Sequence, residues 1–194
     1  SISDKGYSDD FYTYGSDTEI ELSYVVEEYF KSDGKYYTDK NYYRYEPSKG
    51  HHYSNMAYAL IGYLIEEIEG IPFDEYCNRN IFNILNMTST GWKLKDIDIN
   101  KKAIPYNRKF EPYEHYTFAD YPNGQLMTTL NDLSNFLISY IQKGTYRDSI
   151  LLKTSTVELI MEKQFTDVQN EFGLGWYYET IGEYELFGHN GGEQ

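Results

Sequence analysis

Few residues in this chain have the nitrogen or sulfur side chains that zinc and redox sites use. The candidates are one cysteine, Cys77, and four histidines: His51, His52, His115 and His189. No two of the histidines lie four residues apart, the spacing that places two imidazoles on one helix face, and no C-x-x-C is present. A zinc or redox site is therefore not predicted.

The run Asp96-Ile97-Asp98-Ile99-Asn100 begins like a calcium-binding loop. Such a loop needs a glycine at its sharp turn and a bidentate glutamate at its end, but Lys101 and Asn107 occupy those positions. G-x-G-x-x-G, P-loop and G-x-S-x-G motifs are also missing from the sequence. We therefore expect neither a metal nor a cofactor.

Two polar groups remain, and each lies next to a regular pattern. Tyr53-Ser54-Asn55 directly precedes the clearest helical pattern, and His189-Asn190-Gly191-Gly192 follows a strand-like run. In one interpretation both groups belong to an active site. In the other, Tyr53 and Asn55 only cap a helix, where Ser and Asn are favoured, and His189 is a histidine at a strand edge.

The surrounding pattern predicts the elements that position these residues. Apolar residues at helical spacing predict helices over 19–31, with Asp17 or Thr18 as its cap, and over 54–69, ended by Gly70. Further helices are expected from Pro72 to Leu85, over 129–143 and over 155–163, and strands over 173–178 and 184–187 as a hairpin around Gly182. Residues 1–17, 32–52 and most of 88–119 read as loops or short irregular pieces. The pattern indicates an α+β fold that is mostly helical, in one unit without a domain boundary.

Composition limits the classes of partner. The chain of 194 residues carries 31 acidic and 17 basic residues, a net charge of −14, which makes nucleic acid an improbable ligand. Its apolar runs are far shorter than the ~20 residues of a bilayer-spanning helix, so no membrane segment is expected within it. A single cysteine cannot form an internal disulfide, and Cys77 on an apolar helix face is predicted to be a small buried hydrophobe.

Colinear motifs resemble those of the serine β-lactamase-like superfamily, nearest to class C β-lactamases, D-alanyl-D-alanine carboxypeptidases and related esterases. The resemblance begins with Tyr53-Ser54-Asn55-Met56 and the helix after it, and continues through Asn123-Gly124-Gln125-Leu126 to Phe172-Gly173-Leu174-Gly175-Trp176 and Gly188-His189-Asn190-Gly191-Gly192. It covers about residues 50–194 in order. The implied fold is the helical portion of that domain with part of its antiparallel sheet.

In that family the nucleophile is the serine of an S-x-x-K motif that opens a core helix well upstream of the Tyr-x-Asn element. The single match here, Ser32-Asp33-Gly34-Lys35, lies in a polar stretch with no apolar helix after it, and we interpret it as a chance match. The resemblance thus implies that residues 1–194 form one partial domain, without the nucleophile segment and the C-terminal strands.

The resemblance also assigns roles to the catalytic candidates. Tyr53 would be the general base or proton shuttle, since a phenol can serve near neutral pH only where nearby cations favour phenolate. Asn55 would hydrogen-bond the catalytic lysine and the substrate amide, as its side chain both donates and accepts. His189 stands where classical members carry the lysine of a Lys-Thr-Gly strand.

The residues after His189 would bind substrate. Asn190 replaces the small hydroxyl residue, Gly191 would let the backbone approach the substrate, and the Gly192 N–H would be an oxyanion donor. The His-x-Gly form is seen in esterase and peptidase branches. It favours amide or ester hydrolysis over true β-lactamase activity.

Two functions stay open at this point. The first is the central part of a serine hydrolase that acts on a small molecule or peptide through an acyl-enzyme, inactive as this chain alone. The second is a non-catalytic binding or scaffold module of the same fold. Trp92, Trp176 and the tyrosines of 36–45 would be aromatic walls of a cleft or plain core.

Overall fold

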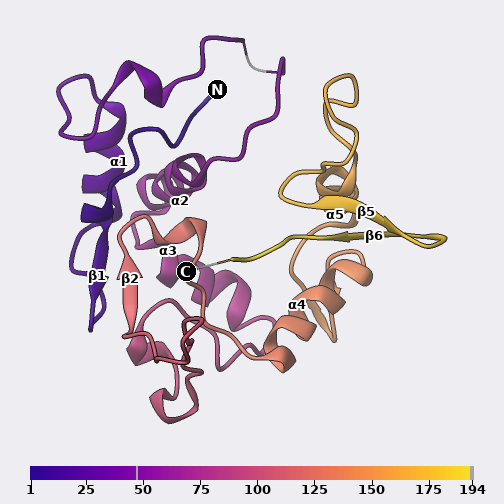
Figure 1. The fold of residues 1–194 in the computed structure, drawn as a ribbon. Coiled ribbons are helices and arrows are strands. Elements are labelled where there is room, and N and C mark those ends of the chain that lie inside the picture. The colour runs from indigo at the N-terminus through magenta and orange to yellow at the C-terminus, as the bar shows by residue number, and fades with distance from the viewer. Residues whose placement is uncertain (47, 193–194) are drawn as a thin grey trace.

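The computed structural model describes residues 1–46 and 48–192. Helices α1, α2 and α3 and strands β1 and β2 lie on one side of the molecule, and α4, α5 and the β5–β6 hairpin on the other (Figure 1). From β6 the chain runs back toward the first side (Figure 1). The bounds are α1 Leu22–Phe30, α2 Asn55–Glu69, α3 Phe73–Cys77, α4 Leu130–Ile141, α5 Thr154–Met161, β1 Tyr12–Tyr14, β2 Tyr116–Phe118, β3 Thr145–Tyr146, β4 Ser149–Ile150, β5 Tyr177–Ile181 and β6 Tyr184–Gly188.

The six strands form three separate two-stranded antiparallel sheets, β1–β2, β3–β4 and β5–β6. In the first, Tyr12 pairs with Phe118; in the last, Tyr177 pairs with Gly188. Together with the helices they confirm the predicted α+β class. The helices predicted over 19–31, 54–69, 129–143 and 155–163 are present, with ends shifted by at most three residues. The helix predicted from Pro72 to Leu85 is confirmed only in part: α3 ends at Cys77, and the chain continues as a π-helical turn over Asn78–Phe82.

The first core cluster lies where α1 packs against α2 and β1–β2. Its buried members are Phe11, Leu22, Val25, Val26, Tyr29, Met56, Ala59 and Ala119. Six of them occupy the inner faces of the two helices, which is the one-sided pattern that the sequence predicts, and Phe11 and Ala119 come from the segments next to β1 and β2. This cluster fixes the position of α2.

The second core cluster lies beneath α3, the π-helical turn that follows it and α4. Its buried members are Cys77, Phe82, Leu85, Met87, Trp92 and Tyr146. Tyr121 packs against both clusters and so joins them. Cys77 is buried as predicted, and burial raises the pKa of its thiol to about 12, which makes it a poor nucleophile.

Three local predictions were wrong. Residues 12–14 form a strand where the sequence indicates a loop, because their partner β2 lies far away in the chain. Neither Asp17 nor Thr18 caps α1, whose N-cap is Glu21; the Asp17 carboxylate instead accepts the Leu94 N–H at 3.0 and 3.2 Å. Strand β5 begins at Tyr177, so residues 173–176 precede it.

Candidate active site

The N-terminal end of α2 is capped by the carboxylate of Asp4, which lies far from this helix in the sequence. Asp4 accepts hydrogen bonds from the Ser54 hydroxyl at 2.7 Å, the Asn55 N–H at 2.7 Å and the Met56 N–H at 3.1 Å. Ser54 is the N-cap and accepts the Ala57 N–H at 3.1 Å. Between them the two side chains satisfy three N–H groups that the first helical turn leaves without a helical partner, and the negative charge lies at the positive end of the helix.

The segment that carries Asp4 is itself fixed by buried hydrogen bonds. The Ser3 N–H donates to the Asn41 carbonyl at 2.8 Å, and the Ser3 carbonyl accepts the Tyr29 hydroxyl at 2.5 Å. The Tyr29 side chain is fully buried in α1. Helix α1 therefore holds the N-terminal segment, and that segment holds the start of α2.

A second carboxylate, Asp120, is fully buried between the same elements. It accepts the Tyr7 hydroxyl at 3.1 Å and the Asn123 side-chain amide. These hydrogen bonds favour the charged form, but desolvation outweighs them and, with the negative charge of Asp4, raises the pKa of Asp120 to about 6.

The middle of α2 packs closely against a short turn of the chain. A Cβ on Gly62 would clash with the ring of Pro122, which belongs to the short 3-10 turn η6 (Tyr121–Asn123). Only glycine lets this turn pack so closely on the helix.

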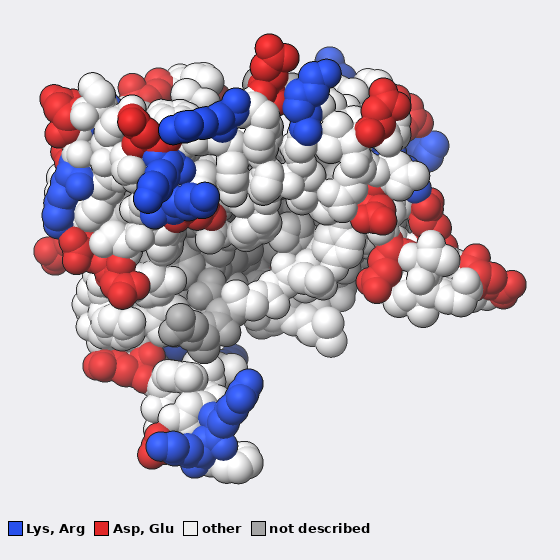
Figure 2. Space-filling model, turned by 45° about the horizontal axis from the view of Figure 1, so that its top comes forward, with Lys and Arg blue, Asp and Glu red and all other residues white. Residues whose placement is uncertain are grey.

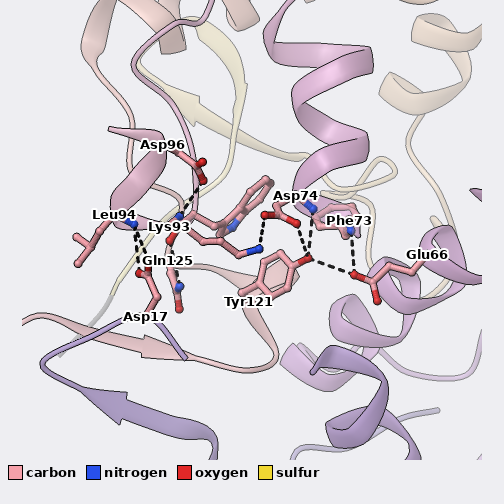
Figure 3. Close-up of polar contacts among 10 residues, drawn as sticks. Asp17, Glu66, Phe73, Asp74, Lys93, Leu94, Asp96, Tyr121 and Gln125 are labelled. Carbon is pink, nitrogen blue, oxygen red and sulfur yellow. Dashed lines mark hydrogen bonds and ion pairs between the residues drawn. The ribbon is translucent and has the colours of Figure 1, made fainter. Parts of the chain in front are cut away.

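Polar contacts hold the C-terminal half of α2. Glu66 accepts the Phe73 N–H at 2.8 Å and the Tyr121 hydroxyl at 3.2 Å, and Asp74 pairs with Lys93 at 2.5 Å (Figure 3). Desolvation raises the pKa of Glu66. The whole of α2 is thus anchored from Asp4 to Glu66, and its N-terminal end keeps a fixed position.

That end opens onto a cleft of about 480 Å³. One wall is formed by residues 48–58 with the start of the chain, and the other by the segment 164–176 with His189. The face seen in Figure 2 is hollowed in the middle, and the side chains around the hollow are mostly uncharged, while acidic and basic side chains gather at the edges.

Tyr53 and His189 both line this cleft, although they are far apart in the sequence. Tyr53 is 59% exposed in the extended segment before α2. His189 lies one residue beyond the end of β6, with its Nδ1 2.6 Å from the Asn190 carbonyl oxygen and its ring 6.0 Å from that of Tyr177. The prediction that His189 lies on a strand was wrong by one residue, because the ladder ends where Gly188 pairs with Tyr177.

The other predicted site residues are not among those that line the cleft. Asn55 is the first residue of α2, and its N–H is bound to Asp4. Asn190, Gly191 and Gly192 are exposed beyond β6, and a Cβ on either glycine would meet no atom within 4 Å. The structure thus brings together Tyr53 and His189 and leaves these four outside the lining.

The predicted aromatic walls divide between cleft and core. Trp176 lines the cleft, whereas Trp92 is 7% exposed in the second core cluster and donates its indole N–H to the Gly124 carbonyl. Tyr36 packs against the first core cluster. His51 and His52 line the cleft as expected for rim residues; His51 stacks on Phe172 at 4.1 Å and His52 on Tyr43 at 4.1 Å.

The chance S-x-x-K match, Ser32 to Lys35, lies outside the cleft. Ser32 is in an exposed turn just after α1, and the Lys35 ammonium is 2.7 Å from Asp10 and 3.0 Å from the Tyr36 hydroxyl. Ser32 does not line the cleft.

A family comparison decides what this arrangement belongs to. The beta-lactamase family model matches residues 34–194, which is most of the chain and includes the cleft residues of 48–58, 164–176 and His189. The chain belongs to the beta-lactamase family. This confirms the resemblance that the sequence motifs indicate.

Comparisons of this beta-lactamase family chain with individual proteins agree with the family assignment. It is 25% identical over 156 residues to N-acetylmuramyl-L-alanine amidase of Bacillus subtilis (strain 168), covering 68% of this chain and 35% of that protein. An octameric penicillin-binding protein homologue from Pyrococcus abyssi superposes with a TM-score of 0.60 at 18% identity, over 90% of this chain and 43% of that one. D-amino acid amidase from Ochrobactrum anthropi SV3 also superposes with a TM-score of 0.60. It is 24% identical, over 75% of this chain and 44% of the amidase chain. The chain spans less than half the length of the curated relatives it matches.

Sequence reasoning missed two parts of the site. Asp4 gave no local signal, because a cap that lies about fifty residues before its helix follows no short motif. The wall residues Phe165, Val168 and Leu174 belong to an irregular stretch of mixed polar and apolar residues, whose exposure is decided only by packing. Within the described residues no group of three or more His, Cys, Asp or Glu could hold a metal ion, and no helix is both long and apolar enough to cross a bilayer.

Proposed function

We infer that this beta-lactamase family chain is the central part of a serine hydrolase that forms an acyl-enzyme. The observation that carries the proposal is that Tyr53 and His189, from opposite ends of the matched region, line one cleft. Substrates would be amides or esters, with peptidase or esterase activity favoured over β-lactam hydrolysis because His189 and Asn190 stand in place of a Lys-Thr pair. The nucleophilic serine and its lysine would come from a segment outside residues 1–194.

The proposed roles follow the demands of acyl transfer. Tyr53 accepts the proton of the serine hydroxyl as its oxygen forms a bond to the acyl carbon, and returns that proton to the leaving nitrogen or oxygen as the old bond breaks. The Gly192 N–H stabilises the oxyanion, and water then releases the acyl group by the reverse sequence. Asn55 orients the lysine and the substrate amide, and His189, Asn190 and Gly191 orient the substrate.

The anchoring of α2 supports this assignment of Tyr53. A proton-transfer group has to stand within hydrogen-bond reach of its partner, and small displacements reduce the rate strongly. Asp4, Ser54 and the first core cluster fix the backbone directly after Tyr53. The side chain itself remains largely exposed to the cleft.

The test uses a longer protein that includes an upstream Ser-x-x-Lys segment, with single-turnover acylation as the readout. Tyr53→Phe keeps the ring and is expected to lower acylation about 10²- to 10⁴-fold, the range for loss of a general base. Tyr58→Phe is the matched control, since Tyr58 also lines the cleft and should keep nearly wild-type rates. We expect Asn55→Ala to fall between these and His189→Ala to be the mildest of the three site variants.

A wild-type acylation rate in Tyr53→Phe would mean that another group is the base. The 194-residue chain alone supplies a second control. It should not react with a fluorophosphonate probe, because Ser32 lies outside the cleft and Lys35 is paired with Asp10. Labelling mapped to Ser32 would contradict the assignment of the nucleophile to a segment outside this chain.

A further inference from the structure

Two neighbouring histidines in the segment before α2 stack on different partners. The His52 ring stacks on that of Tyr43 at 4.1 Å, and the Tyr43 N–H donates to the Ser1 carbonyl at 2.9 Å. Ser1 belongs to the same side of the cleft as His52, so this stack lies within the first wall. The His51 ring stacks on that of Phe172, also at 4.1 Å, and Phe172 belongs to the second wall. His51 therefore joins the two walls of the cleft.

Hydrogen bonds hold the second wall to α5. The Leu174 N–H donates to the Ile160 carbonyl of α5 at 2.8 Å, and the Tyr178 hydroxyl donates to the Met161 carbonyl. None of the residues 162–192 is buried. A wall that is not fixed by burial keeps its position through surface contacts of this kind, so a ring stack onto the opposite wall contributes directly to the width of the cleft.

A row of ring contacts continues from His51 to His189. Phe172 and Tyr177 form an antiparallel bridge, and their ring centroids lie 6.3 Å apart. Tyr177 pairs with Gly188 in the β5–β6 ladder, and its ring lies 6.0 Å from that of His189. A displacement of Phe172 would therefore reach His189 through one bridge and one ladder pair.

We propose that His51 is a positioning residue, whose stack on Phe172 sets the place of His189 relative to Tyr53. His51 stands two residues before Tyr53 in the same extended segment, so one short stretch carries both the proposed proton-transfer group and the contact with the opposite wall. The inference rests on the proposed function where it concerns the rate of acylation, but the contact between the walls does not depend on that function. Small displacements of reacting groups lower rates strongly, so loss of this contact should be visible in the rate.

The kinetic test uses the longer protein with its upstream Ser-x-x-Lys segment, and single-turnover acylation is the readout. His51→Ala is expected to lower the acylation rate about 3- to 10-fold, the range that one aromatic pair supports. His51→Phe keeps a flat ring against Phe172 but cannot carry a proton, and it should restore most of the rate. A rate in His51→Phe as low as in His51→Ala would mean that the imidazole acts chemically, and would overturn the proposal.

His52→Ala is the matched control. It removes a stack of the same 4.1 Å from the neighbouring residue, but within the first wall, and should keep nearly the wild-type rate. Equal losses in His51→Ala and His52→Ala would show that the contact between the walls has no special part in the reaction.

A double-mutant cycle separates positioning from general damage to the fold. If His51 acts through His189, the double variant His51→Ala with His189→Ala should be slower than His189→Ala alone by no more than about twofold. Fully additive losses would mean that His51 acts independently of His189, which contradicts the proposal.

The spacing of the walls can be measured directly in the 194-residue chain. Ile61→Cys in α2 and Leu186→Cys in β6 place spin labels at positions that are 52% and 48% exposed, and the thiol of Cys77 is buried away from the label. Pulsed electron paramagnetic resonance should give one narrow distance distribution, which becomes broader in His51→Ala and stays unchanged in His52→Ala. The same distribution in all three proteins would contradict a positioning role for the stack.

The two proposals fail in different ways. If His51→Ala alone broadens the distance distribution while Tyr53→Phe leaves acylation unchanged, the function falls and the role of His51 between the walls stands. If Tyr53→Phe abolishes acylation but His51→Ala and His52→Ala behave alike in both experiments, the function stands and the positioning inference is wrong.

Discussion

The α2 wall of the cleft and the wall formed by residues 162–192 are built by different interactions. Within the first wall Ser54, Met56 and Ala59 are buried, and Met56 and Ala59 belong to the first core cluster. In 162–192, all of which the structure describes, no residue is buried. That wall is held by the β5–β6 ladder, by aromatic contacts around Trp176 and by the Tyr178 hydroxyl, which donates to the Met161 carbonyl at 2.5 Å.

This contrast has a functional meaning in the proposed enzyme. The wall that carries Tyr53, the proposed proton-transfer residue, is fixed by the cap and the buried face of α2, and general base catalysis depends on such fixed geometry. The other wall, which we propose contacts the substrate, contains no buried residue, so substitutions there are expected to leave both core clusters intact. The three predictions that follow each test this contrast, in order of expected effect.

The largest effect is the expected difference in stability loss when an apolar side chain is truncated in the one wall and in the other. Met56→Ala removes a fully buried side chain and should lower the free energy of unfolding by about 2–5 kcal/mol, because it leaves a cavity in the first core cluster. Leu186→Ala in β6 removes one that is 48% exposed and should cost less than about 1 kcal/mol. Urea denaturation of both variants measures the difference; equal losses would mean that the two walls are packed alike.

The second prediction concerns Asp120, the buried carboxylate beside the capping segment. Its pKa of about 6 lies above the ordinary aspartate value of ~3.9, so the native state binds a proton more tightly than the unfolded state does. The associated stability is fully present below ~pH 4 and is lost as the pH rises through about 6, by up to about 3 kcal/mol.

Asp120→Asn removes this titration. The unfolding free energy of the wild type minus that of the variant should therefore fall as the pH rises from ~4 to ~6. Asp10→Asn is the control: Asp10 is exposed, and Lys35 lowers the pKa of Asp10, so the difference between wild type and variant should stay nearly constant from ~pH 4 to ~6 and fall only at lower pH. A flat curve for Asp120→Asn would mean that the carboxyl is solvated.

The smallest of the three effects is expected from the cap. Asp4→Ala leaves Ser54 and two N–H groups of α2 without their acceptor and should cost about 2 kcal/mol. Asp9→Ala, in an exposed position of the same N-terminal region, should change stability by less than about 0.5 kcal/mol. Hydrogen exchange should localise the loss to the first turn of α2, and protection there equal to the wild type would contradict the capping role.

Prediction from the sequence succeeded where the determining signal is local. The helical period of 54–69 with Ser54 before it and Gly70 after it predicts α2 almost to the residue, and Gly70 adopts the left-handed conformation, φ 68°, that ends a helix. It failed where a partner lies far away, as for β1, for the Asp17 contact with Leu94 and for Asp4. No local sequence signal distinguishes the two tryptophans, but Trp92 is buried in the core whereas Trp176 lines the cleft.

The sequence by itself determined the helices, the hairpin around Gly182, the α+β class and the family, because periodicity, caps and colinear motifs are properties of neighbouring residues. Only the tertiary structure decided that Asp4 caps α2, that Asp120 is buried, and that Tyr53 and His189 share a cleft without charged residues in its described lining. The physical reason is that burial, desolvation and long-range hydrogen bonds depend on which segments pack together. That packing is set by the summed contacts of both core clusters rather than by any local stretch.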